Sequence, residues 1–177
     1  TGPARGSESF QKEIEHVSNH LHTLSRQLHP TIVDDLGLSK ALRSECSRPN
    51  RSDGANIALS VGDGVEDPPK ETALALFRIA QEALRNAARH ADASEINVEL
   101  ISDGDWLQLV IRDNGKGIPT SDTSSGGGIG MNSMRERARL AGGDLSVGSD
   151  GGRGTRVTAR VPRHPEALQK AMALRGE

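Results

Sequence analysis

The longest periodic segment of the chain, Lys70–His90, divides lengthwise into an apolar half and a polar half when it is drawn as a helix at 100° per residue. The apolar half carries Phe77, Ala80, Ala83, Leu84, Ala87, Ala88 and Ala91. The polar half carries Arg78, Glu82, Arg85, Asn86, Arg89 and His90. A helix of this kind buries one face against a core and leaves the other face open to solvent or to a ligand.

Alternating strands follow this helix and fix the fold class. Segments 95–102 and 106–113 read as two strands joined by a short turn, and Leu107, Leu109 and Ile111 share one face of the second strand. Further strands are predicted at 56–61, 144–150 and 155–162, and shorter helices at 38–47 and about 131–141. Together these segments predict an α+β fold, a two-layer α/β sandwich in which helices cover one face of a mixed sheet.

A separate helix is predicted at Phe10–Leu28, before the sandwich. Its apolar residues follow the three-four spacing of a heptad seam, at Ile14, Val17, Leu21, Leu24 and Leu28. Such a narrow stripe needs a partner helix, as in a two- or four-helix bundle, and Pro30 ends the segment. We therefore expect one dimerisation-type helix ahead of the sandwich.

Composition narrows the function classes. The chain has 177 residues and a net charge of -2, which fits one globular domain with a short appendage and gives no reason to expect direct nucleic-acid binding. One cysteine, Cys46, suits a reducing cytoplasm. We find no apolar run of membrane-spanning length and no signal-peptide pattern. The opening "TGPARGSES" reads as a flexible tail, and we expect the chain to be a fragment of a longer protein.

Three polar residues of the long helix suggest a catalytic or metal-binding site. Glu82, Asn86 and His90 stand at i, i+4 and i+8, so their side chains rise along one edge. Asparagine is a poor residue for a helix interior, and its side-chain oxygen could help to hold Mg²⁺. A carboxylate one turn away could orient or deprotonate a nucleophile. The alternative is an ordinary solvated face.

Two glycine-rich stretches suggest close approach of a ligand. The cluster "SSGGGIG", 124–130, runs into a helix, and helix N-termini favour phosphate, although this stretch lacks the lysine of a P-loop. In "DNGKG", 113–117, a turn explains Asn114 and Gly115, but a second glycine at 117 indicates that something passes close to the backbone. A flexible linker and a plain turn remain the alternatives.

Four stretches in order resemble one family. "QEALRNAARHA", "DNGKGI", "GGGIGMNSMRERA" and "GRGTRV" are similar to the N, G1, G2 and terminal Gly-Thr boxes of the GHKL ATPase superfamily, across roughly 56–162. "LSRQLHPTIVDDLGLSKALR" resembles one branch of it. That branch comprises the bacterial sensor histidine kinases with a HisKA_3-type dimerisation domain, which pair with LuxR-type response regulators. The resemblance implies the Bergerat ATP-binding fold, with ATP and Mg²⁺ as cofactors.

The resemblance also implies roles for individual residues. Asp113 would accept a hydrogen bond from the adenine amino group, Asn86 would help to hold Mg²⁺ against the phosphates, and Glu82 would stand where the general base stands. Gly115 and Gly117 would let the backbone pass beside the base, and Thr155 would support the adenine pocket. The remaining residues expected to bind ATP are Arg89, His90, Ile118, Gly128, Ile129, Gly130 and Met131.

The phosphoacceptor histidine of this family lies in a first dimerisation helix. "RQLHP", Arg26–Pro30, imitates its motif, but Pro30 stands where the family has an acid. We therefore interpret Phe10–His29 as the second helix of the hairpin and expect the acceptor upstream of this chain, with His29 as the minority candidate. This interpretation divides the chain into 1–30, a partial dimerisation hairpin; 31–162, the ATP-binding catalytic domain; and 163–177, a tail.

The sequence thus predicts the catalytic domain of a protein-histidine kinase, which passes the γ-phosphoryl group of ATP to a histidine for relay to a response regulator. We expect a homodimer in the full-length protein and a weak dimer or monomer for this chain. We also expect a cytoplasmic domain, and the sequence leaves a membrane anchor in the parent open. Two alternatives are a GHKL serine kinase acting as an anti-sigma factor and a nucleotide-gated interaction module without catalysis.

Overall fold

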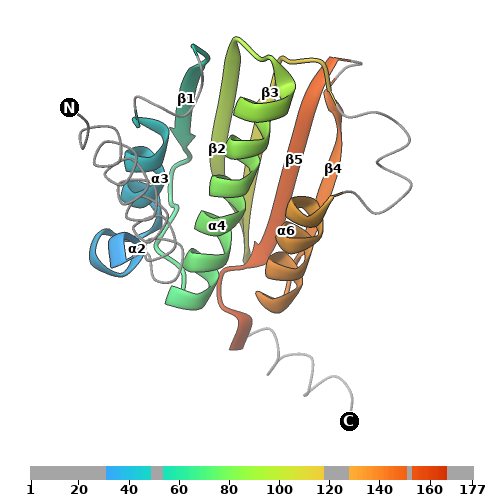
Figure 1. Ribbon diagram of the computed structural model, residues 1–177. Helices are drawn as coiled ribbons and strands as arrows, with labels where there is room; N and C mark the ends of the chain where they lie inside the picture. Colours follow the sequence, from blue (N-terminus) through green and yellow to red (C-terminus); the bar gives the residue numbers. More distant parts are fainter. Residues whose placement is uncertain (1–30, 49–53, 118–127, 151–152, 167–177) are drawn as a thin grey trace, which may run out of the picture. The chain divides into compact units, whose positions relative to one another are not determined.

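The computed structural model describes residues 31–48, 54–117, 128–150 and 153–166 (Figure 1). The chain divides into two compact units, Thr1–Ile32 and Val33–Glu177. Apart from the first two residues of one helix, everything described below belongs to the second unit. The predictions for the heptad helix Phe10–Leu28, for His29 and for the chain beyond 166 lie outside the described residues.

A five-stranded mixed sheet forms one layer, as predicted. Its strands are β1 (Asn56–Val61), β2 (Glu95–Asp103), β3 (Trp106–Asp113), β4 (Asp144–Asp150) and β5 (Arg153–Pro162). The spatial order is β1-β2-β3-β5-β4, in which β1 pairs with β2 in parallel and the other pairs are antiparallel. The last of these strands along the chain, β5, therefore lies in the interior of the sheet.

Helices form the second layer. They are α2 (Thr31–Leu36), α3 (Leu38–Cys46), α4 (Lys70–Asn86), the π-helix η1 (Ala87–Ala91) that continues α4, and α6 (Ile129–Leu140). Helices α3, α4 and α6 lie on one face of the sheet (Figure 1). The predicted two-layer arrangement, with helices on one face of a mixed sheet, is confirmed.

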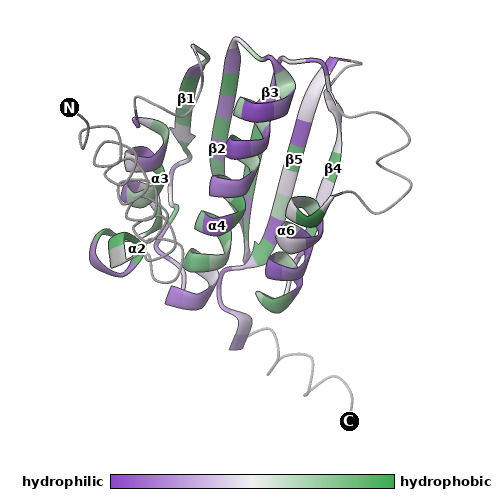
Figure 2. Cartoon of the chain, in the orientation of Figure 1, coloured by the Kyte–Doolittle hydropathy of each residue, from purple (hydrophilic) through white to green (hydrophobic). Residues whose placement is uncertain are grey.

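The core lies between α4 and the central strands. Phe77 and Leu84 of α4 are fully buried, as are Leu107 and Leu109 of β3, which confirms the face assigned to each element from its period. The side of α4 that is turned away from the sheet shows bands of hydrophilic residues (Figure 2). Burial of this helical stripe against one strand face contributes hydrophobic stabilisation to the domain, together with buried residues of α3 and α6.

Helices α4 and α6 run antiparallel beside one another. Gly130, in the first turn of α6, approaches the Glu82 carboxylate so closely that a Cβ there would overlap it. About two turns of α6 further on, Arg137 lies near Arg78, which is earlier in α4. As the residue numbers rise in α6 they fall in α4, so the start of α6 faces the end of α4.

Apart from shifts of one residue, the elements differ from the sequence prediction in four places. Helix α2 was not predicted, because six residues between Pro30 and Gly37 are too short to show a period. The long helix is α-helical to Asn86 and then changes to a π-helix. Helix α6 begins at Ile129, within the glycine cluster, and β5 begins two residues before the predicted Thr155.

Candidate functional site

A cavity of about 610 Å³ lies between the C-terminal half of α4, the first turn of α6 and the sheet. Its walls include eleven of the residues that the sequence singled out. They are Glu82, Asn86, Arg89, His90, Asp113, Gly117, Gly128, Ile129, Gly130, Met131 and Thr155. Ile118 lies outside the described residues, and Gly115 is not among the residues that line the cavity. The fold thus brings together segments that are up to 73 positions apart, Glu82 and Thr155 (155 − 82).

A π-helix presents the upper wall of the cavity. In η1, Ala87 and Ala91 are buried, whereas Arg89 and His90 are exposed and line the cavity. The segment ends at Asp92, whose φ of 51° is the left-handed conformation of a helix C-cap. A π-turn is wider than an α-turn and often occurs at functional sites. Here the π-helix follows Asn86 directly and places the Arg89 and His90 side chains at the cavity.

Asp113 ends β3 with its carboxylate at the cavity. The residue is 9% exposed, and its Oδ1 accepts hydrogen bonds from the backbone N–H of Gly115 at 3.0 Å and of Thr155 at 3.2 Å. Within the described part of the chain, Oδ2 receives no such bond. Because Oδ1 is fixed by two donors, the carboxylate has one orientation and keeps one strong acceptor available to a ligand with an N–H group.

The packing of the fold itself requires glycine at position 115. A Cβ at this position would overlap the Ala91 carbonyl, and the next residue, Lys116, donates its N–H to that same carbonyl at 2.8 Å. Gly115 therefore docks the loop after β3 against the end of η1. Its expected place beside an adenine ring stays a prediction, and the structure supplies a different requirement for glycine there. Gly117, in contrast, lines the cavity and has a φ of +78°.

Asn114 fastens the same loop from the other side. Its Oδ1 accepts the backbone N–H groups of Ser94 at 2.9 Å and Glu95 at 3.0 Å, and its Nδ2 donates to the Ser94 hydroxyl at 2.9 Å. These three bonds hold the loop after β3 to the start of β2. The result is a rigid support under Asp113 rather than a mobile turn.

The opposite end of the cavity is closed by the N-terminus of α6. Residues 128–131 all line it, and Gly128 is the extended residue before the helix. The unpaired N–H groups and the positive end of the helix dipole favour an anion here. Beside this end, Arg85 holds the Glu82 carboxylate by an ion pair of 3.1 Å. The cavity thus has a hydrogen-bond acceptor at Asp113 and an anion-favouring end at α6.

Apart from Ile129 and Met131, the sequence did not single out the apolar residues of the cavity. Ile111, Val157 and Val147 stand opposite one another on β3, β5 and β4, and they form one apolar row across the floor. The alternation of β3 assigns Ile111 to the inner face of the sheet. Only the strand order shows that Val157 and Val147 lie beside it. The other unpredicted lining residues are Ala83, Ala87, Ala91, Lys116 and Met134. An apolar floor with a few polar groups at its ends suits a flat heterocycle attached to an anion.

A metal ion at this site would need oxygen donors from a bound nucleotide in addition to those of the protein. Among the described residues, no group of three or more His, Cys, Asp or Glu side chains is placed to hold a metal. Asn86 lines the cavity as a single neutral oxygen donor. Mg²⁺ is commonly held by substrate phosphates, water and one or two protein oxygens, so this donor fits Mg²⁺ that arrives with a nucleotide. In the same described segments, no helix is both long and apolar enough to cross a membrane.

Comparison with known protein families matches residues 71–165 to a family of ATPases. The matching family is described as histidine kinase-, DNA gyrase B-, and HSP90-like ATPase. The matched range contains all of α4 except its first residue, all the residues that line the cavity and the strands β2 to β5. It therefore accounts for more than half of the chain.

Individual relatives agree with that match. The sensor histidine kinase MctS of Rhizobium johnstonii is 34% identical over 161 residues, which are 90% of this chain and 34% of MctS. The chain thus spans about a third of that relative's length. The histidine kinase domain of the Erythrobacter litoralis EL346 blue-light activated histidine kinase is similar in structure, with a TM-score of 0.53 and 28% identity, over 70% of this chain and 57% of that one. The mycobacterial sensor histidine kinase MprB shares the fold, with a TM-score of 0.55 and 22% identity, over 71% of this chain and 93% of that one.

Proposed function

Because the chain belongs to the family of histidine kinase-, DNA gyrase B- and HSP90-like ATPases, we propose that it is the ATP-binding catalytic domain of a sensor histidine kinase. The observation that carries the proposal is the arrangement of the cavity. A fixed carboxylate, Asp113, stands at one end and the N-terminus of α6 at the other, with an apolar row between them. This arrangement matches ATP, whose base has an amino group and an apolar ring face and whose triphosphate is anionic.

In the proposed complex, the adenine ring lies on the row of Ile111, Val157 and Val147, and its amino group donates to Asp113. The phosphates lie toward the start of α6 and toward the exposed Arg89 and His90 of η1. Thr155 supports the adenine end indirectly, because its backbone N–H fixes the Asp113 carboxylate.

Asn86 is the residue proposed to hold Mg²⁺, together with the phosphates. Bound Mg²⁺ neutralises part of the phosphate charge, as in other phosphoryl-transfer enzymes. Asn86 is the last α-helical residue before η1, so the backbone fixes its position at the cavity wall.

Glu82 is the proposed base of the transfer step. Its carboxylate lines the cavity, is held by Arg85 at 3.1 Å and faces the first turn of α6. In that place it can accept the imidazole proton, or orient the imidazole, while the ring nitrogen attacks the γ-phosphorus and ADP leaves. Positioning and charge neutralisation supply most of the rate enhancement in such reactions.

The acceptor histidine is proposed to lie upstream of this chain, in the first helix of a dimerisation hairpin that belongs to a homodimeric parent. We further propose relay to a response regulator with a LuxR-type DNA-binding output domain. The domain would work in the cytoplasm, where its phosphoryl donor is found, whether or not the parent has a membrane anchor. By itself the chain would be a weak dimer or a monomer.

Radiolabelled ATP tests this function directly. The chain is incubated with labelled ATP and Mg²⁺, alone and with a separately produced upstream dimerisation hairpin from the parent gene. We expect acid-labile phosphohistidine on the hairpin and none on the chain alone. An acid-labile signal on the chain alone that disappears in His29→Gln would instead make His29 the acceptor. Acid-stable phosphoserine on any partner would favour the serine kinase.

A further inference from the structure

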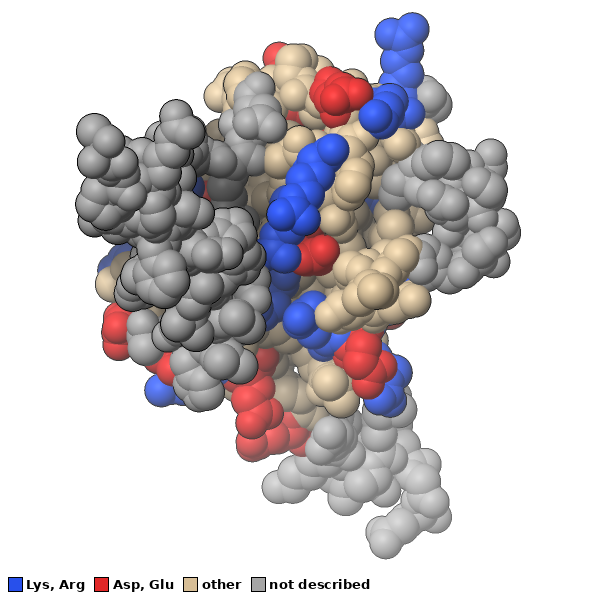
Figure 3. Space-filling model, in the orientation of Figure 1, with Lys and Arg blue, Asp and Glu red and all other residues tan. Residues whose placement is uncertain are grey.

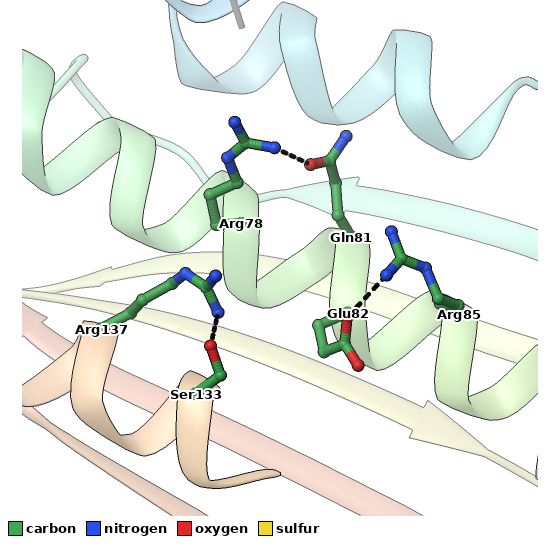
Figure 4. Close-up of polar contacts among 6 residues, drawn as sticks. All are labelled: Arg78, Gln81, Glu82, Arg85, Ser133 and Arg137. Carbon is green, nitrogen blue, oxygen red and sulfur yellow. Dashed lines mark hydrogen bonds and ion pairs between the residues drawn. The ribbon is translucent and has the colours of Figure 1, made fainter. Parts of the chain in front are cut away.

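Three arginines gather on the outer surface of α4 and α6, outside the cavity. Figure 3 shows basic side chains along this helical face, and Figure 4 shows Arg78 and Arg85 on α4 beside Arg137 on α6. Arg78 donates to the Gln81 side-chain oxygen at 3.2 Å, and Arg137 donates to the Ser133 hydroxyl at 2.5 Å. Both partners are neutral. In the part of the chain that the structure describes, only Arg85 of the three pairs with a carboxylate, that of Glu82.

This crowding of like charges works against folding. The pKa of Arg78 is lowered, first by its partial burial and then by the neighbouring charges of Arg137 and Arg85, while Glu45 acts in the opposite direction. A lowered pKa in a base means that its charged form is less stable here than in solvent. Charge arrangements that reduce stability are typical of functional surfaces.

The surface also carries exposed apolar side chains at both ends. On α4, the stripe Leu74, Arg78, Gln81 and Arg85 follows one helical face, and on α6 the stripe Ile129, Ser133, Arg137 and Leu140 does the same. Leu74 is 37% exposed, Leu140 72% and Ile129 93%. Each stripe covers eleven residue steps, which is about 16 Å or three helical turns. Because the helices are antiparallel, Leu74 and Leu140 share one end and Ile129 lies at the other.

We propose that these two stripes form a docking surface for an amphipathic helix of a partner protein, whose carboxylates pair with Arg78 and Arg137 and whose apolar residues cover Leu74, Leu140 and Ile129. A helix lying in a groove between two helices is a common mode of recognition, with anchors at every third or fourth residue. The apolar ends favour a protein helix over nucleic acid, because phosphate groups would cover the arginines but leave the leucines exposed to water. The surface meets the proposed nucleotide site only at Ile129, which also lines the cavity, whereas Arg78, Arg137, Leu74 and Leu140 do not line it.

The test uses a defined probe, a synthetic helical peptide of about three turns. It has leucine at each end and two glutamates between them, spaced like the α4 stripe, and a matched peptide carries lysines in place of the glutamates. Amide shifts of the isotope-labelled chain are followed during titration. We expect changes confined to 74–85 and 129–140 with the glutamate peptide, binding that weakens as salt rises, and no binding of the lysine peptide.

Substitutions test whether the arginines account for binding of the glutamate peptide. We expect the double variant Arg78→Met with Arg137→Met to bind the glutamate peptide at least tenfold more weakly, to keep the ATP affinity of the parent and to unfold at the same or a higher temperature. Arg139→Gln is the matched control, because Arg139 is exposed on α6 and paired with Glu136. Unchanged binding by the double variant, an equal loss in the control, or similar binding of both peptides would overturn the proposal. Tighter binding of short duplex DNA or anionic vesicles to the same residues would also overturn it.

Discussion

Replacement of Asp113 by asparagine isolates the interaction proposed to select adenine. The substitution keeps the size of the side chain and leaves one oxygen, but it turns the other acceptor into an N–H₂ donor. If the amide oxygen keeps the two bonds from Gly115 and Thr155, the amide nitrogen faces the adenine amino group, donor against donor. If the amide flips, the nitrogen meets those two backbone N–H groups instead. In neither orientation of the amide does every one of these N–H donors have an acceptor.

The expected loss follows from this conflict. At 9% exposure Asp113 has little access to water that could substitute for the missing acceptor. A polar group left unsatisfied in such a place costs about 1–3 kcal/mol, which corresponds to roughly 5- to 150-fold in dissociation constant. We therefore expect Asp113→Asn to bind Mg·ATP less tightly by a factor in that range. Calorimetric titration measures it.

Guanine nucleotides provide the sharper comparison. GTP has a carbonyl where ATP has the amino group, so a carboxylate at Asp113 should disfavour GTP and an amide donor should tolerate it. The ratio of ATP to GTP affinity should fall in Asp113→Asn, while Asp105→Asn, an exposed aspartate in the turn before β3, should leave both affinities unchanged. An ATP affinity within twofold of the parent, or an unchanged ATP to GTP ratio, would refute the role of Asp113.

Three further substitutions test other parts of the site. Gly115→Ala should lower the unfolding temperature by several degrees, since overpacking typically costs about 1–3 kcal/mol, whereas Gly148→Ala, where a Cβ meets open space, should have a much smaller effect in the same thermal scan. Asn86→Ala should weaken ATP binding more in Mg²⁺ than in a chelator, and an equal loss in both calorimetric titrations would exclude its role at the metal. Glu82→Gln should keep ATP affinity within about twofold but slow phosphoryl transfer to the added upstream hairpin by on the order of 10²–10⁴-fold, the usual contribution of a general base.

Elements with a long, regular period were predictable from sequence. The apolar stripe of Lys70–Asn86 and the alternation of β3 each describe one buried face, and burial of that face decides the local structure. The change to a π-helix at Ala87 was not predictable in this way, because it depends on where the end of the helix meets the loop after β3. Lys116 donates to the Ala91 carbonyl across that junction, a contact with no local sequence signal.

Most polar residues and glycines of the candidate site were predictable from sequence, but most of its apolar residues and its arrangement were not. The glycines and the acid at 113 stand out because their types are unusual in their surroundings, and resemblance to a family supplied their roles. The apolar floor and the arginine surface were not predicted. Both combine residues from elements that are distant in sequence, such as Arg78 on α4 and Arg137 on α6, and only the packing of those elements brings the residues together.

The glycines that follow β3, Gly115 and Gly117, make close backbone contacts around Asp113 with Gly154, at the start of β5. Gly154 donates its N–H to the Gly115 carbonyl at 2.8 Å, and a Cβ at Gly154 would overlap the Asp113 carbonyl. A Cβ at Gly117 would lie 3.0 Å from the Gly154 carbonyl oxygen, and the next residue, Thr155, donates to the Asp113 carboxylate. The glycines thus allow two backbones to approach closely enough for β5 to orient the side chain at the end of β3. The proposed selection of the base by Asp113 would therefore depend on a backbone contact 42 residues away along the chain as well as on the carboxylate itself.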